Sequence, residues 1–268
     1  MQTPKPHCSK NTTLSGGGKN TTRIAIISTL LLFLFSFSAY ATQQIETLFF
    51  NVSQQEFRIG DETTGDLLNN TFPEYIGKWE YNNATNTLTL TDFVWETSAA
   101  TALEIVGSCT LYVKGTNTFT STFSGSGAHS VGILTGNSLT ISGDKNGILN
   151  ATGGNTTGSS SNIYGIYASS WGSCNIAISG RTVVAKGHTR AISQYPGTPT
   201  FPASRYNWTA NTNYNNAEAT RRTGTTGTKP RTPYTYSTGD RYIEIAPVLR
   251  TFRGNIIVRG GASLIIGK

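Results

Sequence analysis

The residues best suited to chemistry lie late in this chain, where aromatic and basic side chains are interleaved. Aromatic faces can stack on the apolar faces of sugar rings, and an arginine fork can pair with a carboxylate through two hydrogen bonds. The candidate ligand-binding residues are Arg205, Tyr206, Trp208, Arg221, Arg222, Tyr234, Tyr236 and Arg241. Such a set suits an acidic polysaccharide. The alternative is that the aromatic residues close the end of the fold, with arginine stems packed over them.

The sequence contains few groupings of acidic, histidine or cysteine residues of the kind that catalysis or metal binding requires. Between Ile105 and Pro202 the only acidic residue is Asp144, so paired carboxylates cannot project from neighbouring turns of the chain there. His129 and His188 have no Cys or His at metal-ligand spacing, and we expect both to be solvated. We therefore expect no catalytic residue, no bound metal and no cofactor. Calcium, which a polysaccharide lyase would use, has no supporting group of acidic ligands.

A recurring four-residue pattern must build the scaffold that positions these side chains. Apolar residues alternate with small or polar ones at 87–90, 110–113, 138–141 and 175–178, which indicates strands with one buried face. Successive copies are 23, 28 and 37 residues apart, as expected for the turns of a solenoid with loops of variable length. The predicted fold is therefore all-β, a parallel β-helix with an N-terminal cap and an irregular C-terminal cover.

Three columns of inward-facing residues are predicted along the stacked turns. They are Leu88, Leu111, Leu139 and Ile176; Phe93, Phe119, Ile148 and Val183; and Leu103, Ile133, Ile166 and Ile192. Cys109 and Cys174 each lie two residues before a member of the first column, two turns apart. At about 4.8 Å per turn, that separation exceeds the reach of a disulfide, so both thiols are predicted to be free and buried.

The first 41 residues are typical of a signal peptide, because four basic residues precede an apolar run at 24–37 and a small-residue site at 39–41. The run is shorter than the roughly 20 apolar residues of a spanning helix, although a membrane anchor is the alternative. We expect a secreted or cell-surface protein with no membrane span after cleavage. The predicted regions are a signal peptide (1–41), an N-terminal cap (42–80), β-helix coils (81–194), an aromatic and basic C-terminal cover (195–245), and terminal strands or a truncated segment (246–268).

Charge is unevenly distributed along the chain. The formal net charge is +7, yet residues 42–104 hold 2 basic and 10 acidic residues, whereas residues 105–268 hold 15 basic and 4 acidic residues. A basic half attracts an acidic partner such as a uronic-acid polymer. A basic surface without such a partner is the alternative. Nucleic acid would fit the same side chains, but export separates the protein from it.

Residues 79–90, followed by 102–105 and 164–167, resemble bacterial extracellular parallel β-helix proteins grouped as carbohydrate-binding domain-containing proteins. The resemblance spans residues 75–245. It implies a right-handed β-helix on a pectate-lyase-like scaffold, with polygalacturonate binding and no established catalysis. The combined prediction is a secreted or cell-surface, non-catalytic carbohydrate-binding protein. The alternatives are a structural cell-envelope protein or adhesin without a sugar ligand and, less favoured, a polysaccharide lyase.

Overall fold

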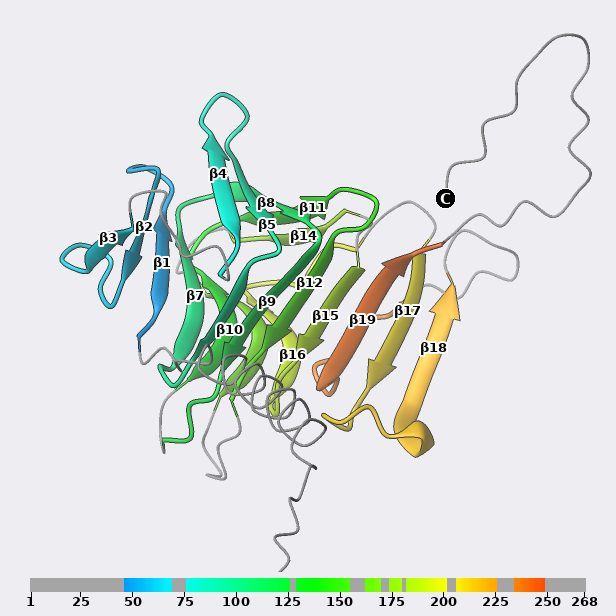
Figure 1. The fold of residues 1–268 in the computed structure, drawn as a ribbon. Coiled ribbons are helices and arrows are strands. Elements are labelled where there is room, and N and C mark those ends of the chain that lie inside the picture. The colour runs from blue at the N-terminus through cyan, green and yellow to red at the C-terminus, as the bar shows by residue number, and fades with distance from the viewer. Residues whose placement is uncertain are drawn as a thin grey trace, which may run out of the picture. The chain divides into compact units, whose positions relative to one another are not determined.

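Three β-sheets make up most of the described chain in this computed structural model (Figure 1). The structure describes residues 46–68, 76–125, 129–154, 162–169, 174–179, 182–201, 206–225 and 234–248. All of them belong to the unit Gln44–Lys268. The predicted signal peptide and most of the predicted terminal segment lie outside the described residues. The described segments are strands, turns and one 3-10 helix, Glu218–Thr220, and they include no helix long and apolar enough to cross a membrane.

Sheet A has seven strands in the order β18-β17-β19-β15-β12-β9-β6. Its strands are β6 (Val94–Thr97), β9 (Thr116–Ser121), β12 (Ile148–Thr152), β15 (Thr182–Lys186), β17 (Tyr206–Asn211), β18 (Arg221–Thr225) and β19 (Tyr242–Pro247). The strands from β6 to β15 are parallel to one another, whereas β19, β17 and β18 pair antiparallel. Figure 1 shows the antiparallel strands continuing the sheet beyond β15.

Sheets B and C complete the stack. Sheet B has the order β16-β13-β10-β7-β1-β2-β3, with β1 (Leu48–Asn51), β2 (Glu56–Ile59), β3 (Asp66–Leu68), β7 (Thr101–Val106), β10 (Ser130–Thr135), β13 (Ile163–Ser169) and β16 (Arg190–Tyr195). Sheet C has the order β14-β11-β8-β5-β4, with β4 (Lys78–Asn82), β5 (Thr87–Thr91), β8 (Cys109–Lys114), β11 (Leu139–Gly143) and β14 (Ile176–Ile178). Antiparallel strands β2, β3 and β4 end the two sheets on the N-terminal side.

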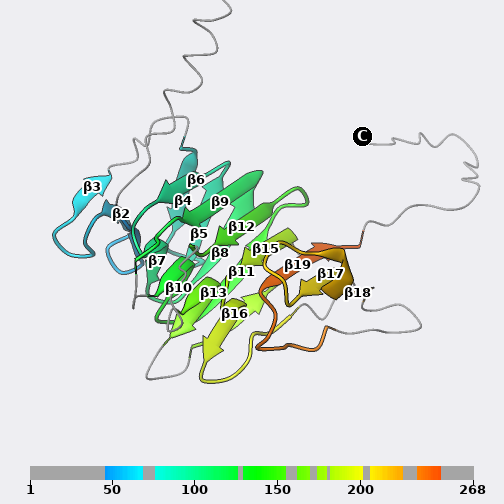
Figure 2. The ribbon, with the colours of Figure 1, turned by 90° about the horizontal axis from the view of Figure 1, so that it is seen from below.

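From β7 to β16 the chain visits sheets B, C and A in turn and then returns to B. Each return places a strand beside the equivalent strand of the turn before, as seen for β9, β12 and β15 in Figure 2. Alternating residues on β5 are buried and half-buried, as the period-2 pattern predicts. This is the all-β, stacked parallel arrangement of a β-helix-like solenoid.

The third predicted column is confirmed residue by residue. Ile133 pairs with both Leu103 and Ile166, and Ile166 pairs with Ile192. All four side chains are buried. Leu48 of β1 pairs with Leu103 and extends this column toward the N-terminus.

The first column is confirmed at two of its three steps, because Leu88 pairs with Leu111 and Leu139 pairs with Ile176. Its middle step and the second column were wrong in register. In sheet C, Leu111 pairs with Ile141 rather than Leu139, and Leu139 is level with Cys109 and Ile176. In sheet A, Phe119 pairs with Trp95 rather than lying level with Phe93. A two-residue slip leaves every side chain on the same face, so the alternation in sequence cannot detect it.

One member of the second column was assigned to the wrong face. Leu149 is fully buried and pairs with Val183, whereas Ile148 is half-buried and pairs with Thr182. Two adjacent apolar residues leave the inward face ambiguous in a period-2 pattern.

Both cysteines of the described residues are free and buried, as predicted. The two cysteines do not share a column as predicted, because Cys109 is level with Ile176 and therefore lies two residues along the strand from the level of Cys174. Burial raises the pKa of Cys109 to about 12. The Cys174 thiol donates a hydrogen bond to the Tyr195 carbonyl over 3.2 Å.

Sheets A and B approach each other closely at two glycines that the sequence patterns did not single out. A Cβ atom on Gly132 would lie 2.5 Å from the Thr152 nitrogen, and one on Gly165 would lie 2.6 Å from the Lys186 nitrogen. The missing side chains therefore let β10 and β13 approach the backbone of sheet A.

Candidate functional site

Most of the aromatic residues predicted to bind a ligand are buried. Tyr206, Trp208 and Tyr234 are 3%, 7% and 7% exposed. The Trp208 and Tyr234 ring centroids are 5.3 Å apart. Tyr236 is half-buried and donates a hydrogen bond to the Ile192 carbonyl of β16. The rings of Tyr206, Trp208 and Tyr234 are therefore packed among the C-terminal segments and offer little open ring face to a sugar.

Arg222 also has a structural partner. Its guanidinium forms an ion pair with Asp240, whose side chain is fully buried and also accepts a hydrogen bond from the Tyr234 hydroxyl over 2.7 Å. Burial, followed by this hydrogen bond, raises the pKa of Tyr234 far above its ordinary value. The Arg222, Tyr234 and Asp240 cluster therefore holds the C-terminal strands together. Arg205 lies outside the described residues.

Arg221 and Arg241 remain exposed and lie at one end of sheet A. Arg221 begins β18 and pairs in the sheet with Asn211, the last residue of β17. Arg241 immediately precedes β19, and its backbone nitrogen donates to the Asn211 carbonyl over 2.8 Å. The antiparallel pairing thus gathers two of the predicted residues that are 20 positions apart in the chain.

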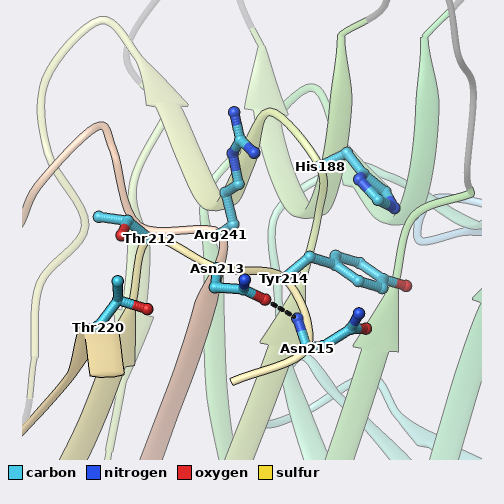
Figure 3. Close-up of a pocket in the computed structure, with 7 residues that line it drawn as sticks. All are labelled: His188, Thr212, Asn213, Tyr214, Asn215, Thr220 and Arg241. Atoms are coloured by element: carbon cyan, nitrogen blue, oxygen red, sulfur yellow. Dashed lines mark hydrogen bonds between the residues drawn. The ribbon is translucent and has the colours of Figure 1, made fainter. Parts of the chain in front are cut away.

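An open pocket of about 350 Å³ lies at this end of the sheet (Figure 3). Its lining comes from the turn after β15, the loop after β17, the 3-10 helix and the residue before β19. The lining residues are His188, Thr212, Asn213, Tyr214, Asn215, Thr220 and Arg241. The Asn213 side chain accepts a hydrogen bond from the Asn215 nitrogen over 2.8 Å, which shapes the loop. The lining combines neutral polar groups with one guanidinium.

His188 and Tyr214 form the aromatic wall of this pocket. Figure 3 shows the two rings lying one over the other, with Arg241 projecting from the segment just before β19. The ring centroids are 4.0 Å apart and the planes are 15° from parallel. The Gly187 nitrogen donates a hydrogen bond to the Arg241 carbonyl over 3.0 Å. This bond links the turn that carries His188 to the start of β19 beside the pocket.

The imidazole of His188 is held in a setting that disfavours its charged form. Burial, and next the charge of Arg241, lower its pKa below the ordinary value of 6.5. Its Nε2 atom is buried and has no hydrogen-bond partner among the described residues. The prediction of a solvated histidine therefore does not describe His188, whereas His129 is exposed.

A third cation, Lys186, lies at the same end of sheet A. It ends β15 and pairs with Tyr242, and its Nζ atom is 5.7 Å from the Tyr242 ring centroid. We call Lys186, Arg221 and Arg241 the basic rim. The ion pairs of the described chain involve Arg58 and Arg222, so no residue of the basic rim is paired with a described carboxylate. The rim and the pocket together form the candidate site, which can bind an anion that also bears hydroxyl groups.

The sequence patterns did not single out most of the pocket residues. Thr212, Asn213 and Asn215 belong to a polar loop with no motif, and Tyr214 carries no distinguishing spacing. Their proximity to His188 depends on the antiparallel pairing of β19 with both β15 and β17. No group of three or more His, Cys, Asp or Glu residues that could hold a metal occurs in the described segments.

No protein family, no curated protein and no solved structure matches this chain.

Proposed function

We propose that this chain is a secreted or cell-surface, right-handed parallel β-helix protein that binds an acidic polysaccharide without catalysing a reaction on it. The proposal retains the resemblance to extracellular carbohydrate-binding β-helix proteins. One observation carries it: the basic rim lies at the edge of an open polar pocket, and none of its three cations is paired with a described carboxylate.

The chemistry of the candidate site fits a sugar acid. Exposed cations raise the local concentration of a polyanion, and arginine pairs with carboxylates through directed hydrogen bonds. The side chains of Asn213, Asn215 and Thr212 carry donors and acceptors suited to sugar hydroxyls. The Thr220 hydroxyl donates to Asn211 and keeps only acceptor capacity. No carboxylate lines the pocket, so the paired acids of a glycosidase are not provided there. Binding is the function that these groups support.

This proposal moves the predicted site. Arg221 and Arg241 stay in it, and Lys186, His188 and Tyr214 join it. The buried aromatic residues support the strands that carry the pocket instead of stacking on the ligand.

The proposal is tested by isothermal titration of the full chain with polygalacturonate. Each exposed arginine–carboxylate contact contributes at most about 1 kcal/mol, so the double variant Arg221→Ala with Arg241→Ala should bind about tenfold more weakly. Lys145→Ala removes an exposed cation from the turn before β12 and serves as the matched control. Added salt should weaken wild-type binding, because the contacts are exposed.

Two outcomes would contradict the proposal. Equal affinity for the methyl-esterified polymer would show that the carboxylates are not recognised, and full affinity in the double variant would place binding elsewhere. Formation of unsaturated sugar ends, followed by ultraviolet absorbance, would instead favour the lyase alternative. Absence of binding to acidic and neutral glycans alike would favour the structural alternative.

A further inference from the structure

His188 is the one side chain of the candidate site that can change charge near neutral pH. Its ring forms part of the pocket wall, stacked on Tyr214 with 4.0 Å between centroids. Its buried Nε2 atom has no partner in the described chain, so an ionised ring would hold an unpaired N–H group there. The free pocket therefore holds a neutral imidazole.

The charged and titratable groups around His188 come from the segment before β19, from the loop after β17 and from the ends of the strands that flank its own turn. Arg241 approaches from the start of β19, and its positive charge opposes protonation of the ring. Tyr214 comes from the loop after β17, and burial raises the pKa of its phenol, so it stays uncharged. The turn that carries His188 is flanked by two positively charged residues, Lys186 at the end of β15 and Arg190 at the start of β16. The remaining lining side chains are neutral.

We infer that His188 takes up a proton when a carboxylate binds in this pocket, so that an acidic sugar binds more tightly as the pH falls below neutral. The inference rests on the proposed function and adds a regulatory residue to it. A carboxylate that pairs with Arg241 offsets the charge that repels the imidazolium, and it adds an attraction of its own. The free protein disfavours the charged ring, and the complex favours it.

The sign follows from linkage. A group whose pKa rises on binding takes up protons in the complex, so affinity increases as the pH falls through the interval between the two values. A rise of about one pKa unit corresponds to about a tenfold change in the dissociation constant. The sugar carboxylates stay ionised down to about pH 5, because their pKa lies near that of an ordinary carboxyl.

The test is titration of the full chain with a galacturonate trimer at about pH 7.5 and about pH 5. Wild-type protein should bind about tenfold more tightly at the lower pH, and buffers of different ionisation enthalpy should report proton uptake. His188→Gln should lose the pH dependence, so that its affinity for the trimer is the same at the two pH values whatever that affinity is. His129→Gln, which changes an exposed histidine outside the pocket, should keep it.

A second measurement does not depend on a variant. The pKa of His188 in the wild-type protein, followed by NMR, should rise by about one unit when the trimer is saturating. An unchanged pKa, or full pH dependence in His188→Gln, would overturn the inference while leaving the proposed function intact. Absence of trimer and polymer binding at both pH values would overturn the inference together with the proposed function.

Discussion

Gly165 is predicted to be a position where one methyl group disrupts the packing of two sheets. A Cβ atom there would lie 2.6 Å from the Lys186 nitrogen, 2.7 Å from the Ala191 oxygen and 2.8 Å from the Ala151 oxygen. All three are backbone atoms, so a rotamer change cannot relieve the overlap. Gly165 lies between the pairs Tyr164–Arg190 and Ile166–Ile192, which hold its strand in place.

The expected cost of Gly165→Ala follows from two opposing effects. Overpacking of a close-packed interior costs about 1–3 kcal/mol, and displacement of backbone puts this case at the upper end. The smaller conformational entropy of unfolded alanine offsets about 0.4–1 kcal/mol. We expect a net loss of about 2 kcal/mol in the free energy of unfolding, or a decrease of about 4–8 °C in Tm for a chain of this size.

The assay is urea and thermal unfolding followed by circular dichroism, with Gly136→Ala as the matched control. A Cβ atom on Gly136 would meet only the Ser169 oxygen, at 3.7 Å, which is ordinary contact. The control should therefore be as stable as the wild type or slightly more stable. If Gly165→Ala unfolds at the same urea concentration as Gly136→Ala, the close approach of sheets A and B is refuted.

Three further predictions concern buried polar groups. Asp240→Ala removes the acceptor of the Tyr234 hydroxyl and should lower the free energy of unfolding, measured in urea, by about 1–3 kcal/mol. An unchanged midpoint of urea unfolding would contradict the structural role of the Arg222, Tyr234 and Asp240 cluster. Burial raises the pKa of Tyr234, and raises that of Tyr242 to about 12, so the unfolded chain releases these protons at lower pH than the folded protein does. Stability should thus be complete below about pH 10 and fall as the pH rises above it, and Tyr242→Phe should make this decline in Tm shallower. Cys109 and Cys174 should react with a thiol reagent at about pH 8 only after unfolding in urea, assayed in a Cys8→Ser background; rapid labelling without urea would show that they are not buried.

Alternation along single strands predicted much of the fold. Residues 87–90 lie in β5 with Leu88 and Leu90 fully buried, and the column from Leu103 to Ile192 has the predicted pairing. The pattern succeeds because one buried face of a strand imposes a period of two on the side chains.

Register was less accessible to sequence reasoning. The pairing of Leu139 with Cys109 depends on the length of the corner at residues 136–138, and a shift by two residues preserves the face. Ile148 was misassigned because the adjacent Leu149 is equally apolar. Packing against the neighbouring turn decides between such choices, and no single strand contains that information.

The candidate site shares Arg221 and Arg241 with the residues predicted from the sequence. Arg221 and Arg241 keep exposed side chains, whereas Trp208 of β17 and Tyr234, in the segment before β19, are buried. An aromatic residue in a polar segment has the same appearance in sequence whether it faces a ligand or a core, because the distinction depends on the elements that cover it.

The sequence alone determined two properties. The period-2 patterns and their spacing indicated stacked strands, and the distribution of charged residues showed that the later half of the chain is basic. Tertiary structure alone decided which residues share a level, which aromatic rings are covered, and that His188, Tyr214 and Arg241 meet at one pocket. The physical reason is that alternation is a property of each strand by itself, whereas register and antiparallel pairing depend on the fit between segments far apart in the chain.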